Sequence, residues 1–219
     1  MTPTLPAWRR ATTGERRWPV AVAVLVVAGL QLTLPDEVVI GSRWLLPVLE
    51  IAVLAVLLVA TRFETEPVWR RTVSLALTAL IGVANAVAAV RLVIHLVEGR
   101  GGDDPGPLLA TGAAIWATNV IGFALWYWQF DRGGPTARAR GDREVPDFWF
   151  PQMQSADLDP EWEPQFVDYL YVSFTNATAF SPTDTMPLSR WAKLVMLVQS
   201  AVSLATVALV VARAVNVLR

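Results

Sequence analysis

Long runs of apolar residues separated by short polar stretches dominate the pattern along this chain. A helix needs about 20 mostly apolar residues to cross a bilayer, and five runs fit this length, at residues 19–35, 43–61, 72–97, 108–129 and 188–216. A sixth run, residues 164–181, is shorter and more polar. The pattern predicts an all-α polytopic membrane protein with five long transmembrane helices. The shorter segment, fifth in order, either crosses completely or forms a re-entrant, pore-like helix.

Composition supports a membrane protein and excludes several classes of function. Hydrophobic residues make up 54% of the chain, against about 45–50% in soluble domains. The chain has no cysteine, and its single histidine, His95, cannot build a multi-histidine metal site. A net charge of −1 gives no support for nucleic-acid binding. Hydrolase, zinc-protease and phosphate-loop motifs are not found. We therefore expect no enzyme activity, no cofactor, no metal site and no nucleic-acid partner.

Basic residues divide the chain into regions and predict its orientation. Arginines cluster before the first apolar run, which we expect to be an uncleaved helix, and again at residues 132–143. Because cytoplasmic loops are rich in basic residues, we expect a multi-pass plasma-membrane protein with a cytoplasmic N-terminus. We divide the chain into a four-helix region (1–129), a linker (130–163) and a C-terminal module (164–219).

The linker changes from basic to acidic along its length. Residues 147–168 contain six acidic residues and no Lys or Arg, interleaved with Phe148, Trp149, Phe150 and Trp162. Such a segment is either an ordinary acidic loop at the membrane surface or a docking site for a partner.

The candidate intramembrane charged residues are Glu50, Arg91, His95 and Asp168. Buried charges in membranes pair with one another or mark a pathway. At about 1.5 Å rise per residue, Glu50 and Arg91 lie at similar depths and can form an ion pair. That pair is either a tie between helices or part of a pathway.

The last apolar run carries a polar stripe. Gln199, Ser203, Thr206, Val210 and Arg213 follow helical spacing and share one face. A polar stripe on such a helix either lines water or packs closely against another helix. Gln199 and Arg213 at its two ends favour water slightly.

Residues 168–175 read Asp-Tyr-Leu-Tyr-Val-Ser-Phe-Thr, followed by an acid and basic residues before the last helix. This signature resembles a bacterial family of integral membrane proteins of about this size. The family has four preceding helices, an acidic aromatic linker and the signature D-[FY]-L-Y-F-[AS]-F-T. The resemblance spans most of the chain and implies an inner-membrane location, but it carries no established activity.

The last 55 or so residues also resemble the pore module of tetrameric potassium channels. Tyr171 and Ser173 match the pore helix, Thr178 and Asp184 flank the filter position, and Pro187 and Arg190 precede the inner helix. The resemblance implies a tetramer. However, the filter position reads Ala-Phe-Ser-Pro-Thr at residues 179–183, without the glycines that align successive carbonyls. Potassium selectivity is therefore not predicted.

The expected function is a channel-like or transport protein in the lipid bilayer, a homo-oligomer that conducts inorganic cations. Its pathway candidates are Ser173, Asn176, Thr178, Ser181, Thr183, Asp184, Gln199, Ser203 and Thr206. The alternative is an assembly protein that docks a partner through the acidic aromatic linker. The charge pattern favours six complete crossings with both termini inside, in which case Thr183 lies outside. A re-entrant loop would enter from the cytoplasm.

Overall fold

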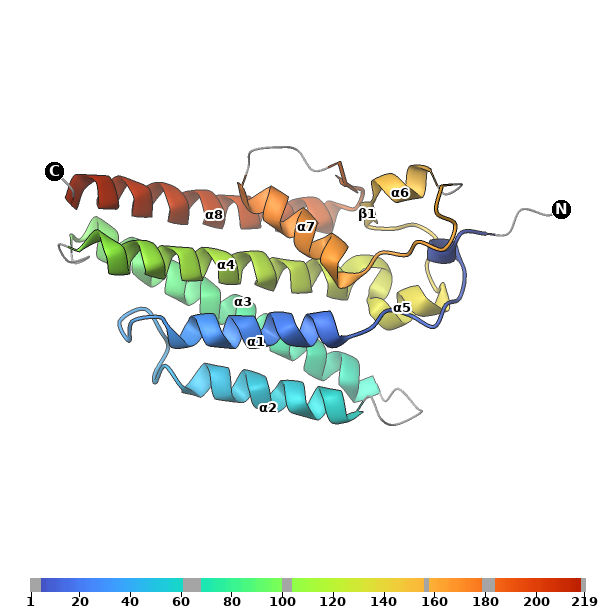
Figure 1. Cartoon of the computed structure of the whole chain (residues 1–219), viewed down its shortest axis with the longest axis horizontal. Coiled ribbons are helices and arrows are strands. Elements are labelled where there is room, and N and C mark those ends of the chain that lie inside the picture. Colours follow the sequence, from blue (N-terminus) through green and yellow to red (C-terminus); the bar gives the residue numbers. More distant parts are fainter. Residues whose placement is uncertain (1–4, 61–67, 100–103, 156–157, 179–183, 218–219) are drawn as a thin grey trace. The chain divides into compact units, whose positions relative to one another are not determined.

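A computed structural model describes residues 5–60, 68–99, 104–155, 158–178 and 184–217. The chain is predominantly helical, as predicted (Figure 1). The helices are η1 (Ala7–Arg9), α1 (Trp18–Leu32), α2 (Leu45–Ala60), α3 (Val68–Val97), α4 (Pro105–Phe130), η2 (Asp131–Gly133), α5 (Pro135–Arg140), α6 (Pro151–Gln154), α7 (Phe166–Thr178) and α8 (Arg190–Val217). Two short strands, β1 (Phe148–Trp149) and β2 (Met186–Pro187), pair antiparallel.

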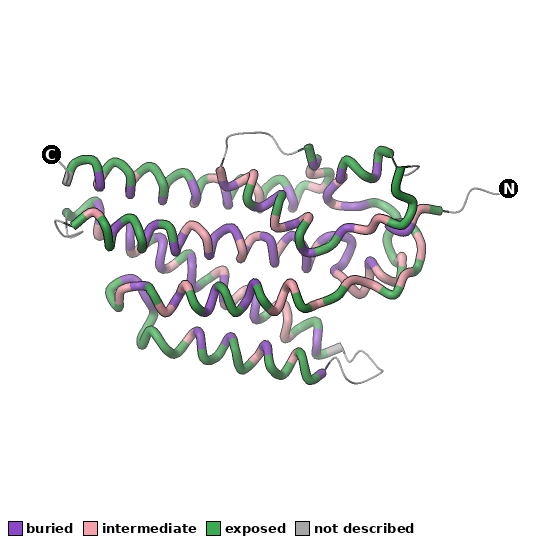
Figure 2. Tube along the Cα trace, in the orientation of Figure 1, coloured by how far each residue is buried: buried purple, intermediate pink, exposed green. Residues whose placement is uncertain are grey.

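Three helical stretches among the described residues are long and apolar enough to cross a membrane. They are Trp69–Val97, Pro105–Arg140 and Arg190–Asn216. Figure 2 shows that much of α8 is exposed, and its exposed residues include Leu197 and Leu204, each 67% exposed. Exposed leucines on a long apolar helix are typical of contact with lipid.

The expectation of five long transmembrane helices is not met by the first two apolar runs. α1 has 15 residues and α2 has 16. α1 ends at Leu32, close before Pro35, because a proline disfavours helical conformation in the residue that precedes it. α2 begins only at Leu45, after a loop that Gly41 turns with a positive φ of 69°.

Two compact units make up the chain. One contains residues 1–19 and 123–200 and is called here the α7 unit. The other contains residues 20–122 and 201–219 and is called the α3 unit.

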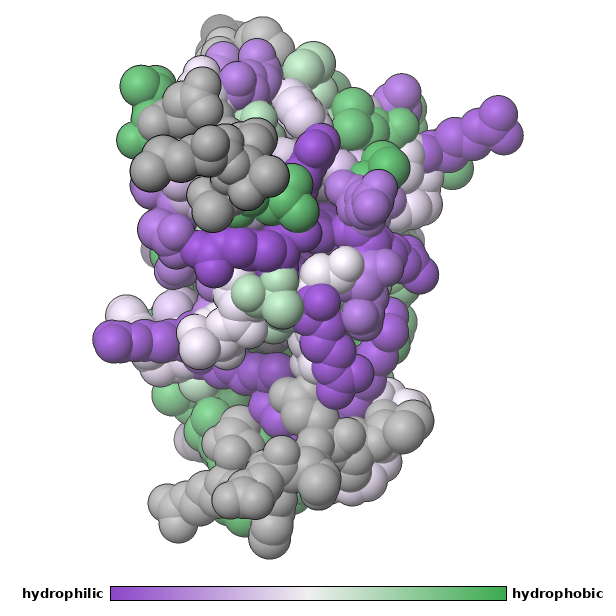
Figure 3. Space-filling view, turned by 90° about the vertical axis from the view of Figure 1, so that its right-hand side faces the viewer, coloured by the Kyte–Doolittle hydropathy of each residue, from purple (hydrophilic) through white to green (hydrophobic). Residues whose placement is uncertain are grey.

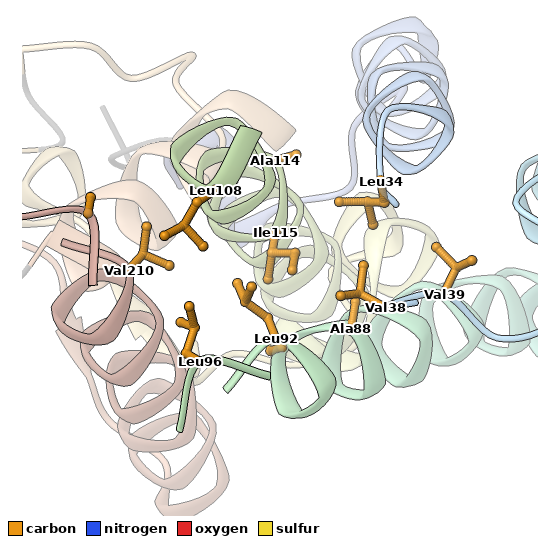
Figure 4. Close-up of a cluster of buried hydrophobic side chains, with 12 residues drawn as sticks. Leu34, Val38, Val39, Ala88, Leu92, Leu96, Leu108, Ala114, Ile115 and Val210 are labelled. Carbon is orange, nitrogen blue, oxygen red and sulfur yellow. The ribbon is translucent and has the colours of Figure 1, made fainter. Parts of the chain in front are cut away.

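The α3 unit has an apolar core where α3, α4 and the end of α8 meet. Leu92 and Leu96 of α3 face Leu108 and Ile115 of α4, and Val210 of α8 closes the cluster (Figure 4). Leu34, Val38 and Val39 add the loop after α1 to the same core. In this unit α8 runs antiparallel to α4, because Ser203 accepts a hydrogen bond from Asn119 (3.0 Å) while Val210 lies against Gly112.

In the α7 unit the chain enters and returns at one end of α7. Near the first turn of α7, the Tyr169 hydroxyl donates to Asp131, directly after α4 (2.5 Å). Near its last turn, the Asn176 amide donates to the Met196 carbonyl, well inside α8 (2.9 Å). β2, which precedes α8, is nevertheless paired with β1 beside the end of α4. β2 therefore brings the chain back to the end of α7 at which it entered.

We expect G112A to destabilise the α3 unit. A Cβ atom at Gly112 would lie 2.8 Å from a Val210 methyl group. Overpacking of this kind costs about 1–3 kcal/mol, which exceeds the roughly 1 kcal/mol that alanine gains in helix propensity. Thermal unfolding of the purified protein measures the effect. G29A, at a helical glycine with nothing within 4 Å of its Cβ position, is the matched control. Equal stabilities of G112A and G29A would contradict this packing, and V210A should rescue G112A.

Candidate functional site

A buried carboxylate, Asp131, connects the end of α4 to the linker and to α7. Its side chain is 0% exposed. One oxygen accepts the backbone N–H of Asp147 (2.8 Å), and the other accepts the Tyr169 hydroxyl (2.5 Å). Asp147 in turn accepts the backbone N–H of Arg132 (2.9 Å) and the indole N–H of Trp191 at the start of α8 (2.7 Å). A chain of hydrogen bonds therefore links α4, the linker, α7 and α8 within the α7 unit.

A second buried group, the ion pair of Glu15 and Arg138, extends this network to the N-terminal segment. The two side chains lie 3.0 Å apart and are 7% and 6% exposed. Arg138 also donates to the carbonyls of Trp128 (2.6 Å) and Asp131 (3.1 Å). Glu15 accepts the indole N–H of Trp128 and the backbone N–H of Phe166 (2.8 Å), the first residue of α7. Glu15 therefore joins four segments of the unit.

The turn after α4 brings these groups together. Arg132 has a positive φ of 52°, and Gly133 and Gly134 continue the turn at 85° and 97°. Residues other than glycine rarely adopt this left-handed backbone conformation. Arg132 is held in it by its own contacts, because its guanidinium donates to the carbonyls of Trp8 and Arg143 (2.8 Å to Arg143). A Cβ atom at Gly134 would lie 2.8 Å from the Gln129 carbonyl, so the tight turn requires glycine there.

The aromatic residues of the linker are used largely inside the α7 unit. Phe148 is fully buried, with ring centroids 5.0 Å from Tyr127 and 5.8 Å from Trp191. Phe150 contacts Trp162 (5.6 Å). Hydrophilic side chains are prominent on the face shown in Figure 3. Two of the linker acids are tied to the N-terminal segment, since Glu161 binds Arg10 and Glu163 accepts from Thr12 (2.7 Å).

Gln199 is the centre of a polar cluster on the predicted stripe. It is 0% exposed, and its amide N–H groups donate to the carbonyl and the hydroxyl of Ser173 (2.9 and 2.7 Å). Its carbonyl oxygen accepts from the Tyr127 hydroxyl (2.5 Å) and the Asn176 amide (2.8 Å). Ser200 donates to Asn176 as well (3.1 Å). Within a single chain, the polar groups of these residues therefore form hydrogen bonds with one another, as in contacts between packed helices.

The other pathway candidates differ in their placement. Ser203 and Thr206 are buried in the α3 unit, where Ser203 meets Asn119. Thr178 is half-buried at the end of α7, and Asp184 is exposed. Ser181 and Thr183 lie outside the described residues. Asp168 accepts the backbone N–H of Gln165 (2.8 Å), as a capping carboxylate does in the first turn of a helix.

The predicted ion pair between Glu50 and Arg91 does not form. Glu50 is 0% exposed and accepts instead from the amide of Gln31 on α1 (2.8 Å). Arg91 donates to the carbonyl of Val39 in the loop between α1 and α2. Although the two residues were expected at similar depth, Glu50 binds Gln31 and Arg91 binds the Val39 carbonyl instead. His95 lines a surface hollow that also includes Glu37.

Sequence analysis missed the groups that hold the α7 unit together. Glu15, Asp131 and Tyr169 come together only in the folded chain. The one sequence signal for Asp131 is its position directly after an aromatic-rich apolar run. Gln31 was a polar residue within the first apolar run and could have been paired with Glu50. Among the described residues, no group of three or more His, Cys, Asp or Glu could hold a metal ion.

Comparison of the chain with models of protein families, with curated proteins and with solved structures gave no match.

We expect Glu15 to make the stability of the protein depend on pH. Burial raises the pKa of Glu15 above its ordinary value of 4.5, although Arg138 opposes the shift. The folded protein then holds a proton at pH values where the unfolded chain has lost it. The contribution of Glu15 to the free energy of unfolding is therefore greatest below pH 4.5 and falls as the pH rises through the raised pKa.

Unfolding of wild type and E15Q over a pH series measures this contribution. The stability of wild type relative to E15Q should fall with rising pH. E144Q, at an exposed glutamate of the same unit, should keep the wild-type pH dependence. A gain in wild-type stability over E15Q with rising pH would contradict the assignment.

Proposed function

We propose that this chain is a channel-like or transport protein of the plasma membrane, and that α7 with the segment after it is its pathway-forming element. The single observation that carries the proposal is the return of the chain to one end of α7. A short helix that is followed by a return segment and a long apolar helix is the arrangement of a pore loop. The sequence resemblance to a pore module covers these same residues.

The charge pattern orients this element in the membrane. The arginines of residues 132–143 favour a cytoplasmic location for the end of α4. Trp191 contacts Asp147 beside that end, so α8 starts from the same side. With α1 and α2 as shorter spanning helices, the chain crosses five times. Its N-terminus is then cytoplasmic and its C-terminus lies on the opposite side.

The pathway is completed by other copies of the chain. Ser173 and Gln199 are buried and bound to each other, and Ser203 is buried and bound to Asn119. These contacts favour a packing role for the three residues. Thr178 and the exposed Asp184 are the described residues left to face an ion, together with Ser181 and Thr183 outside the described residues. The exposed face of α7 carries Val167, Tyr171 and Phe174, which suits contact with a neighbouring subunit or lipid. We propose a homo-oligomer, a tetramer by resemblance, with inorganic cations as the conducted species.

Cysteine labelling tests the re-entrant topology, because the chain has no native cysteine. Single cysteines at Ser155, Asp184 and Asp104 are treated in intact cells with a thiol reagent that does not cross membranes. We expect S155C and D184C to behave alike, protected until the cells are opened, and D104C to react from outside. Opposite behaviour of S155C and D184C would show that residues 164–181 cross completely.

Ion flux into liposomes tests conduction itself. We expect the purified protein to pass monovalent cations above the level of protein-free liposomes. D184N should lower cation flux several-fold at low ionic strength, because an acidic group at a pore mouth concentrates cations. D159N, at an exposed acid elsewhere in the α7 unit, is the matched control. Absence of flux for several cations in both directions would contradict the proposal.

A further inference from the structure

Glu50 and Gln31 form an incompletely satisfied buried pair in the α3 unit. Gln31 is 5% exposed and Glu50 is 0% exposed. The Gln31 amide N–H donates to one Glu50 oxygen (2.8 Å). The other carboxyl oxygen, Oε2, and the Gln31 carbonyl oxygen are both buried and meet no donor. Two acceptors without donors therefore remain in adjacent side chains that are already joined by one hydrogen bond.

Among the residues that the structure describes, no cation pairs with a negative charge on Glu50. Arg43 lies in the loop after α1, and its guanidinium is bound to Asp36 (2.7 Å). Arg91 donates to the carbonyl of Val39. An unpaired buried carboxylate is costly, and a buried carboxyl group takes up a proton when it finds no cation.

One proton accounts for both unsatisfied oxygens. A hydrogen on Glu50 Oε2 can donate to the Gln31 carbonyl oxygen, while the Gln31 amide donates to Glu50 Oε1. The two side chains then form a neutral acid–amide pair with reciprocal hydrogen bonds. Such a pair leaves neither a buried charge nor an unmatched acceptor between them.

A small cavity lies beside Gln31, and Glu50 is not among the residues that line it. Its volume is about 20 Å³, and its lining includes Gln31, Asn85 and Thr118 from three helices. This volume holds about one water molecule. The hydroxyl of Thr118 is buried there without a partner, so the cavity offers a water at least two polar neighbours. The charged group in the lining is Arg43, whose positive charge disfavours a metal cation.

We propose that Glu50 is an exchangeable proton-binding site, with Gln31, which lines the cavity, as its hydrogen-bonding partner. On release, the O–H bond at Oε2 breaks and the proton passes to water, which leaves a carboxylate bound to the Gln31 amide. The site uses none of the residues of the proposed pathway. Absence of ion flux would therefore not contradict the proposal that Glu50 binds a proton.

Infrared difference spectroscopy of the full chain in liposomes, recorded during a pH titration, tests the site. We expect a protonated-carboxyl C=O band that shifts in D₂O and disappears as the pH rises. The band should be absent from E50Q, in which an amide pairs with the Gln31 amide. E37Q, which removes an exposed carboxyl from the same unit, should keep the band unchanged.

Two results would overturn the proposal. One is the same set of carboxyl bands in E50Q as in wild type. The other is loss of the band on addition of sodium at constant pH, which would make the cavity a cation site. If E50Q does not fold, Q31L replaces it. Loss of the carbonyl acceptor should then move the Glu50 band to higher frequency, and an unmoved band would also overturn the proposal.

Discussion

The carboxylate of Asp131 places a charge in the interior of the α7 unit, and the surrounding structure is arranged to accept it. Removing a carboxylate from water costs several kcal/mol unless hydrogen bonds and opposite charges compensate for the loss. Here the compensation comes from Tyr169 on α7, from the backbone at Asp147 and from the nearby guanidinium of Arg138. Because each partner belongs to a different segment, the requirement to satisfy one charge fixes where α7, the linker and α5 lie around the end of α4.

The need to satisfy buried polar groups also explains which features could be predicted from the sequence. The α3 and α4 helices follow from the length of their apolar runs, since a run of that length has no other way to satisfy its backbone in a membrane. The lengths of α1 and α2 did not follow, because their ends depend on local features around Pro35 and Gly41. The polar stripe on α8 was found by spacing, but spacing could not tell water from packing. Asn119 binds Ser203 and Asn176 binds Gln199, so these two residues of the stripe have hydrogen-bond partners within the chain.

Pairing of buried polar groups was the least predictable part of the fold. Glu50 and Arg91 have compatible depths, yet a guanidinium on a long side chain reached the Val39 carbonyl and an amide on α1 reached Glu50. Depth along a helix can be estimated from residue number, whereas rotation about the helix and the identity of its neighbour cannot. Asp131, Glu15 and Tyr169 are similar, because the hydrogen-bond partners of their side chains lie between 16 and 151 residues away in the chain.

The ties between the N-terminal segment and the residues around 160–166 have a consequence for biosynthesis. The backbone N–H of Ala7 donates to Pro160 (2.8 Å), Thr12 binds Glu163, and Glu15 binds Phe166 across a separation of 151 residues. Contacts of such high sequence separation form late, because the intervening chain must first be made and placed. Residues 7–15 therefore leave the ribosome well before their partners and are among the last to reach their native contacts. While the intervening helices are translated, Glu15 is a hydrated carboxylate that lacks the hydrogen bond from Phe166.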